Sequence, residues 1–390
     1  MPLALFALTI AAYAIGTTEF VVVGLLPTVA NDLSITLPMA GLIVSVYALG
    51  VTFGAPVLTA LTGRLPRKTL MLGLMGVFVL GNGAAALSPT YEMLLVARVI
   101  SAFAHGVFFS IGATIAADLV PENRRASAIA MMFMGLTVAI VTGVPLGTFI
   151  GQLFGWRATF WGVASLGVIA FAAIAVLLPS NLTRAEPARL LDQVRVLGSG
   201  RLLLVFGMTA FGYGGTFVAF TYLSAVLQNI TGFSEASVSL ILVFYGLAIA
   251  VGNLAGGRIA DRNPVRALSV LFALQAATLV VFTFTAVSPV LALAALGFLQ
   301  FASVPGLQLY VVQLAKLHRP GGVDVASALN IAAFNLGIAI GAWVGGLVVS
   351  SSLGLSATPW VAAILVTFAV GLTRISGALD RRASSVLQAT

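Results

Sequence analysis

The first apolar stretch, from Leu3 to Ala30, is long enough to cross a membrane and carries one charged residue, Glu19. About 20 apolar residues span the hydrocarbon core as a helix. A charge at that depth costs roughly 2.5–3.5 kcal/mol on insertion scales, so we expect this acid to have a use. Two uses stay open at this point. Glu19 is either a protonated acid bonded to a neighbouring helix or a proton carrier.

Similar apolar stretches recur along the whole chain. Of its 390 residues, 60% are hydrophobic and 8% are charged, whereas soluble domains carry about 25% charged residues. The strands of a membrane β-barrel would alternate polar and apolar residues, and these stretches do not. The sequence predicts an all-α membrane protein with twelve spanning helices, at 3–29, 39–62, 69–88, 91–117, 127–152, 159–178, 202–228, 236–257, 266–287, 289–315, 326–350 and 358–376.

The basic residues between these segments predict the orientation. Of the 19 Lys and Arg residues, 17 fall on one side of the predicted membrane, and the turns on the other side contain only Arg157. Cytoplasmic loops carry such an excess of basic residues, so we expect both termini in the cytoplasm. The net charge of +8 is then a topology signal, and no nucleic-acid partner is expected. The predicted location is a bacterial-type inner (plasma) membrane.

The chain divides into two similar halves. The predicted domains are a six-helix bundle at 1–180, a cytoplasmic linker at 181–200, and a second six-helix bundle with a short tail at 201–390. Aligning Arg64 with Arg262 brings the first segment onto the seventh. Parallel six-helix repeats place a substrate site near the membrane midplane, between the halves.

Several motifs together resemble those of a known family. They are Gly16-Thr17-Thr18-Glu19-Phe20 with Gly24-Leu25-Leu26-Pro27, Gly143-Val144-Pro145-Leu146-Gly147, and Gly155-Trp156-Arg157. Nearly the whole chain resembles the major facilitator superfamily, within its twelve-helix drug:proton antiporter group. The branch it resembles most contains arabinose-efflux-permease-like, sugar-efflux and chloramphenicol-resistance proteins. The resemblance implies twelve helices in two six-helix pseudo-repeats and proton-driven export.

The resemblance also implies gating residues. The family's cytoplasmic loop motif is matched after the eighth segment, but after the second segment Thr59 and Gly63 replace its first glycine and its aspartate. Glycines and a proline in the fifth segment match a pattern that the family associates with exporters. Glycines also allow close helix packing in any bundle, and proline bends a helix. The gating candidates are Arg64, Arg67, Gly257, Asp261, Arg262, Arg266, Gly143, Pro145 and Gly147.

Arg98, in the fourth segment, matches the buried arginine that the family places beside its proton site. At 1.5 Å per residue, Arg98 lies roughly 11 Å and Glu19 roughly 15 Å below the outer surface, which are comparable depths. His105 follows seven residues after Arg98, on the same helix face. Histidine titrates near neutrality, so Glu19, Arg98 and His105 are the predicted proton-coupling residues.

The second half offers uncharged polar residues within its spans. We expect the halves to divide their roles, with proton chemistry in the first and substrate contacts in the second. Each of these polar residues is about as well explained as a contact between helices. The substrate-binding candidates are Tyr47, Phe103, Phe109 and Thr137 in the first half, and Tyr213, Tyr245, Gln300, Gln308, Asn330 and Asn335 in the second.

Three functions compete. The first is proton-coupled efflux of a small, largely uncharged organic molecule such as a sugar or an amphenicol-type drug. The second is proton-linked uptake or facilitated diffusion on the same fold, and the third is a receptor that transports nothing. Without cysteine or a nucleophile–base cluster, we expect no enzyme, catalytic residue, cofactor or metal site. The expected partners are substrate, protons and the lipid bilayer, and the expected state is a monomer.

Overall fold

The computed structural model describes residues 2–62, 65–121, 125–180, 182, 195–284, 290–319 and 322–389. Within these ranges, twelve helical stretches are long and apolar enough to cross a membrane. The predicted all-α membrane fold is therefore confirmed. The chain forms two compact units: unit 1 contains Met1–Arg189 and Leu223–Gly246, and unit 2 contains Leu190–Tyr222 and Leu247–Thr390.

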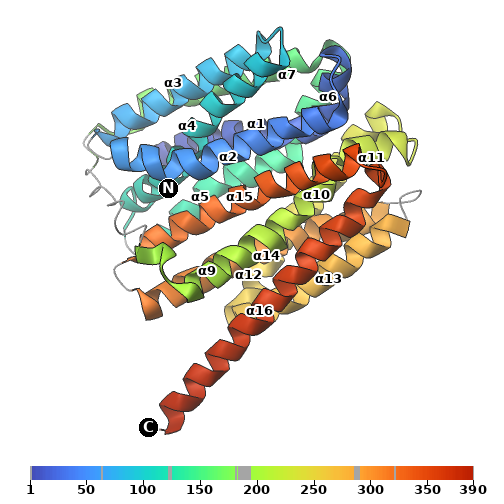
Figure 1. Cartoon of the computed structure of the whole chain (residues 1–390). Helices are drawn as coiled ribbons and strands as arrows, with labels where there is room; N and C mark the ends of the chain where they lie inside the picture. The colour runs from blue at the N-terminus through green and yellow to red at the C-terminus, as the bar shows by residue number, and fades with distance from the viewer. Residues whose placement is uncertain are drawn as a thin grey trace. The chain divides into compact units, whose positions relative to one another are not determined.

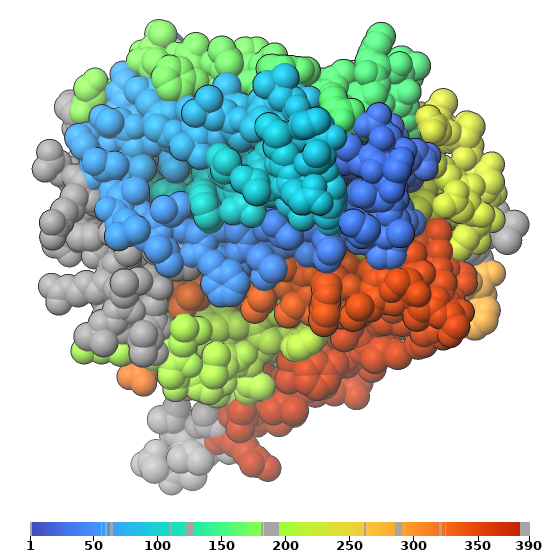
Figure 2. Space-filling view, turned by 45° about the horizontal axis from the view of Figure 1, so that its top comes forward, coloured from blue at the N-terminus to red at the C-terminus, as the bar shows by residue number. Residues whose placement is uncertain are grey.

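Unit 1 is built around the long helix α1 (Leu3–Asp32). Helices α1 to α4 run side by side in Figure 1, and their blue-to-cyan atoms are closely packed in Figure 2. The remaining elements of this unit are α2 (Leu37–Thr62), α3 (Arg67–Ala86), α4 (Tyr91–Asp118), α5 (Arg125–Val138), η2 (Ala139–Gly143), α6 (Val144–Phe154), α7 (Trp156–Leu177), α11 (Leu223–Asn229) and the first part of α12 (Glu235–Arg262).

Unit 2 contains the remaining described helices. Helix α13 packs on both α14 and α16, while α10 packs on α15. The last turns of α16 extend past the neighbouring helices of this unit (Figure 1). The elements are α9 (Gly200–Met208), η3 (Thr209–Tyr213), η4 (Gly214–Thr216), α10 (Phe217–Phe220), the remainder of α12, α13 (Pro264–Phe284), α14 (Val290–His318), α15 (Val323–Ser350), η6 (Leu355–Ala357) and α16 (Thr358–Ala389).

Local sequence accounts for several helix ends. Thr90 precedes α4 and its side chain accepts a hydrogen bond from the backbone N–H of Met93, as an N-cap residue does. Between α6 and α7, Gly155 has a φ of 83°, a conformation that glycine adopts without steric cost. The chain can therefore turn sharply there from one span into the next.

Two spans are interrupted by π-helical turns. In the fifth span, η2 lies between α5 and α6, and Pro145 is the second residue after it. A proline inside a helix lacks an N–H and its ring crowds the carbonyl four residues earlier, here that of Val141, so the wider turn accommodates it. In the seventh span, α9 gives way to η3 and the short 3₁₀ turn η4, within a sequence that contains Gly212, Gly214 and Gly215.

The predicted segments agree with the described spans except in detail. The seventh, predicted as one helix over 202–228, is a series of short helices, and the twelfth continues to Ala389 instead of ending at 376. Residues 223–246 pack with unit 1, although they fall in the predicted second domain. The predicted domain boundaries stay a prediction, and most of the predicted linker at 181–200 lies outside the described residues.

Candidate functional site

Arg98 joins helix α4 to helix α1 in the interior of unit 1. Its side chain is fully buried, and its Nη1 donates hydrogen bonds to the carbonyl oxygen and to Oγ1 of Thr18, both at 3.0 Å. The guanidinium also lies over the ring of Tyr47, 3.9 Å from the ring centroid. Glu19, the next residue along α1, is within electrostatic range of this cation. The two residues predicted to share one depth are thus neighbours.

His105 completes the cluster from two turns further along α4. Its Nδ1 lies 4.0 Å from Oε2 of Glu19 and 3.1 Å from the hydroxyl of Tyr47. Its ring packs against that of Phe109, with the centroids 5.1 Å apart. The side chain of His105 is 5% exposed and that of Glu19 is 10% exposed. We call Glu19, Tyr47, Arg98 and His105 the charged cluster.

Two donors of Arg98 lack an acceptor. Its Nε and Nη2 are buried and have no hydrogen-bond partner among the described residues. An unmade hydrogen bond at a buried charged group costs about 1–3 kcal/mol or more. The cluster therefore holds a cation that can still donate hydrogen bonds to a carboxylate, carbonyl or hydroxyl oxygen, and the Glu19 carboxyl group is one such acceptor nearby.

Two residues that sequence reasoning missed support Arg98. The hydroxyl of Thr18 donates to Oδ1 of Asn82 at 2.6 Å, and Nδ2 of Asn82 donates to the carbonyl of Phe78 at 2.9 Å. Both side chains are fully buried. The available signal was a lone asparagine within the otherwise apolar third span, because amides inside a span bond to neighbouring helices.

The other predicted residues of unit 1 are divided between the cluster and its surroundings. Tyr47 belongs to the charged cluster, and Phe109 packs against its His105 and stacks on Phe133, with the ring centroids 5.2 Å apart. Phe103 is 37% exposed and contacts Gly54 of α2, about 140° around α4 from Arg98 at 100° per residue. Thr137 is partly buried on α5. Their roles in substrate binding stay predictions.

In unit 2, two of the predicted polar residues, Gln308 and Asn330, form hydrogen bonds between helices, while Asn335 bonds within its own helix. The hydroxyl of Thr209 donates to Asn330 at 2.7 Å, Asn330 donates to Gln308 at 2.9 Å, and Gln308 donates to Ser327 at 2.5 Å. Asn335 donates to the carbonyl of Ile331. The chain of hydrogen bonds joins η3, α14 and α15, so the amides of Gln308 and Asn330 stabilise the packing of unit 2.

The aromatic candidates of unit 2 are buried. The ring of Tyr213 packs edge-on against Phe301 at 5.6 Å and Phe334 at 4.9 Å. Tyr245 and Gln300 are 2% and 1% exposed. A binding role for any of them stays a prediction.

The gating candidates are only partly described. Nη1 of Arg67 pairs with Asp118 at 2.8 Å, which ties the start of α3 to the end of α4. Arg266 is exposed, and Gly257 has open space around it apart from Pro305. Arg64 and the side chains of Asp261 and Arg262 lie outside the described residues.

The glycine–proline pattern lies where α1 meets the fifth span. A Cβ at Gly143 would meet Thr17, and one at Gly147 would meet Val21 at 2.6 Å. Pro145 is buried between them. These glycines therefore let the fifth span approach the part of α1 that carries Glu19, as expected of small residues at helix contacts in lipid.

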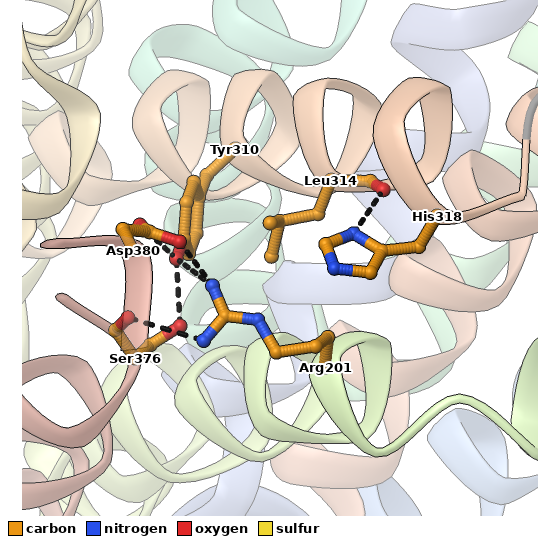
Figure 3. A network of polar contacts seen from close by, with 6 residues as sticks. All are labelled: Arg201, Tyr310, Leu314, His318, Ser376 and Asp380. Carbon is orange, nitrogen blue, oxygen red and sulfur yellow. Dashed lines mark hydrogen bonds and ion pairs between the residues drawn. The ribbon is translucent and has the colours of Figure 1, made fainter. Parts of the chain in front are cut away.

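Unit 2 has a second charged network that the sequence did not predict. Arg201 at the start of α9 pairs with Asp380 of α16, and Asp380 also accepts from the hydroxyl of Tyr310 at 2.8 Å. The same hydroxyl lies 2.6 Å from Oγ of Ser376. Figure 3 shows these side chains pointing toward one another from α9, α14 and α16. The network links α9, α14 and α16 through side-chain hydrogen bonds and an ion pair.

Comparison with known proteins decides the family. The model of the Major Facilitator Superfamily matches residues 8–323 and again 206–385. The chain belongs to the major facilitator superfamily. It is therefore a multi-pass membrane transporter and not an enzyme.

Individual members of the superfamily agree with this. The chain is 56% identical over 351 residues to an uncharacterized MFS-type transporter of Bacillus subtilis, YtbD, covering 89% of each chain. It is 34% identical over 349 residues to a chloramphenicol resistance protein of Streptomyces lividans, covering 88% of each. The fold matches the crystal structure of a bacterial homologue of the human lysosomal transporter Spinster, with a TM-score of 0.77, 15% identity and 96% of both chains covered.

Proposed function

We propose that this protein is a proton-coupled antiporter that exports a small, largely uncharged organic molecule. The observation that carries the proposal is the burial of Glu19 beside Arg98 and His105 inside a membrane-spanning unit. Ionisable residues inside spans are expensive, face the bundle interior or water, and mark ion and proton pathways. Glu19 is the proposed proton carrier, with Arg98 and His105 controlling when it ionises.

The charged cluster can accommodate Glu19 in both its protonated and its ionised form. When Glu19 carries a proton, it is neutral and needs no cation beside it. When it loses the proton, Nε and Nη2 of Arg98, which have no partner among the described residues, would stabilise the carboxylate through charge-assisted hydrogen bonds once a conformational change brings them within reach. A conformational change that alters the distance between Glu19 and Arg98 would then change proton affinity. Such a change is what couples proton movement to alternating access.

The absence of a charged residue in the middle of the second-half spans favours a substrate with little charge. A sugar or an amphenicol-type compound would be recognised by hydroxyl, amide and aromatic groups. The relative from Streptomyces lividans is named a chloramphenicol resistance protein, which supports testing amphenicols first. Export is favoured by the glycine–proline pattern of the fifth span and by that relative. Uptake on the same fold is the alternative.

The proposed setting follows from the same observations. The distribution of Lys and Arg supports both termini in the cytoplasm. A bacterial inner membrane supplies the proton gradient that the mechanism needs. We propose that a single chain carries out the cycle, because the charged cluster is complete within unit 1.

The test is transport into everted membrane vesicles of a panel of sugars and amphenicols, with and without an imposed pH gradient. We expect at least one compound to be concentrated only when the gradient is present. Glu19→Gln preserves shape and mimics a protonated acid, so this variant should bind the compound but fail to concentrate it. If Glu19→Gln concentrates the compound as well as the parent does, Glu19 is not the coupling site. Movement of substrate and proton in the same direction would favour the uptake alternative.

A further inference from the structure

Arg98 is held to α1 by two acceptors on one residue, and neither belongs to Glu19. Nη1 donates to both the carbonyl oxygen and Oγ1 of Thr18. The carbonyl oxygen is fixed by the backbone of α1. The hydroxyl oxygen can rotate, so whether it accepts from Arg98 depends on what takes its proton.

Asn82 determines the orientation of the Thr18 hydroxyl group. Its Nδ2 donates to the carbonyl of Phe78 at 2.9 Å, which turns Oδ1 toward Thr18. An amide oxygen only accepts hydrogen bonds, so Thr18 must donate its proton to Asn82. The lone pairs of Oγ1 then face Arg98. The amide on α3 thereby orients a hydroxyl on α1, and that hydroxyl orients a guanidinium on α4.

The result is a cation near Glu19 that makes no hydrogen bond to it. With Nη1 held by Thr18, the guanidinium lies over the ring of Tyr47, 3.9 Å from the ring centroid. Its Nε and Nη2 stay without partners among the described residues. If Nη1 were released, the guanidinium could turn and form a two-bond pair with the Glu19 carboxylate, the geometry that arginine favours.

We propose that Asn82 is a positioning residue that acts through Thr18 to hold Arg98 away from a direct ion pair with Glu19. This inference rests on the proposed role of Glu19 as the proton carrier. The function of Asn82 is to let Glu19 both bind and release a proton during the cycle. A permanent ion pair with Arg98 would leave Glu19 ionised throughout the cycle.

The titratable groups around Glu19 define what else could affect its titration. Among the described residues, helix α4 contributes Arg98 and His105, and helix α2 contributes Tyr47. Asn82 and Thr18 carry no charge. Replacing them therefore changes the titration of Glu19 only through the orientation of these groups.

The experiment follows the carboxyl group directly and needs no substrate. The carbonyl stretching band of protonated Glu19 is recorded by infrared difference spectroscopy across a pH titration of the full-length protein in lipid bilayers. Loss of the band in Glu19→Gln assigns it. In Thr18→Val and Asn82→Leu, the oriented side-chain acceptor is lost and only the backbone carbonyl of Thr18 still holds Nη1. The guanidinium is then freer to turn and pair with the carboxylate, so the band should disappear at a pH lower by about one unit.

Two matched variants separate positioning from general damage. Thr18→Ser keeps the hydroxyl and should titrate as the parent does. Ser101→Ala removes another fully buried hydroxyl, one that bonds to the carbonyl of Ala97 and lies against Gly81 of α3, and it should also match the parent. If Thr18→Val does not fold, the smaller Thr18→Ala removes the same hydroxyl without adding bulk.

The outcomes distinguish the two proposals. If Glu19 titrates in the parent but the midpoint in Thr18→Val and Asn82→Leu is unchanged or higher, the positioning role is wrong while proton coupling stands. The positioning role is also wrong if Thr18→Ser or Ser101→Ala shifts as far as Thr18→Val. If no band in the parent depends on Glu19, the proton-carrier role and the positioning role both fail.

Discussion

The hydroxyl of Tyr47, a predicted substrate-binding residue, lies 3.1 Å from Nδ1 of His105 within the charged cluster. The same nitrogen is 4.0 Å from Glu19. His105 is therefore hydrogen-bonded to Tyr47, and Glu19 lies just beyond hydrogen-bond distance of the same nitrogen. Tyr47 also covers Arg98 with its ring, and these two contacts can be separated by mutation.

Tyr47→Phe should change the pH dependence of transport while leaving the fold intact. The ring over Arg98 is kept, but Nδ1 of His105 loses its hydroxyl partner and becomes available to Glu19. The check is the pH profile of gradient-driven transport in reconstituted liposomes. Tyr47→Leu removes the ring as well, and we expect it to lower thermal stability, because a cation over an aromatic face is worth about 0.5–2 kcal/mol. A profile for Tyr47→Phe that overlays the parent would show that the hydroxyl has no part in coupling.

Arg98→Lys should fail to restore coupled transport. Lysine keeps the charge but lacks the planar fork that reaches Thr18 and leaves donors for Glu19. A lost charge-assisted hydrogen bond of about 1.5–3 kcal/mol corresponds to a reduction of roughly tenfold or more in the coupled rate. The measurement compares Arg98→Lys with Arg98→Ala in liposomes under an imposed gradient. Parental activity in Arg98→Lys would show that a point charge is enough.

Gly143→Ala should destabilise unit 1 because its new methyl group meets Thr17 of α1. Overpacking of this kind costs about 1–3 kcal/mol. Gly162→Ala is the matched control, since nothing lies within 4 Å of that position. Thermal unfolding of the purified variants in detergent measures the difference. Adding Thr17→Ala to Gly143→Ala should recover part of the loss, and equal melting temperatures for both glycine variants would contradict the close contact.

Asp380→Asn should destabilise unit 2 by leaving Arg201 without its carboxylate (Figure 3). The arginine side chain is 17% exposed and Asp380 is 36% exposed. Partial hydration therefore limits the loss to the lower part of the range of about 1–3 kcal/mol. Arg374→Gln, at an exposed position of the same helix, is the control and should unfold as the parent does. If Asp380→Asn and Arg374→Gln have the same unfolding temperature, the network does not stabilise the packing of α16.

Much of the fold was predictable because membrane spans follow from a single physical requirement. A stretch must be apolar for about 20 residues to cross the hydrocarbon core, and all twelve predicted segments coincide with described spans. The break in the seventh span was not predictable by this means. Hydropathy averages over a window, and Gly212, Gly214 and Gly215 are as acceptable in a lipid-facing helix as in a broken one.

The candidate site was only partly predictable for a different reason. Glu19 and Arg98 stand out because a charge within a span is rare. Asn82 and Thr18 are uncharged, and no periodicity marks which helix an amide will contact. The pairing of Arg201 with Asp380 joins residues from opposite ends of the second half, and the sequence alone offers no reason to pair them over any other charges near the same loops.

The π-helical turn η2 changes how many residues the fifth span can contain. A π turn makes hydrogen bonds between residues five apart where an α-helix uses four, so it holds one residue more. The side chains before and after it are therefore offset by about 100° relative to an uninterrupted α-helix. Deleting one residue from Ala139–Gly143 would convert the π turn into a regular α-helical turn. The helix contacts of α5, of α6 or of both would be kept. The same deletion in the uninterrupted α7 would turn half of that span's packing face toward lipid. The fifth span is thus one place where this fold can absorb a change in length.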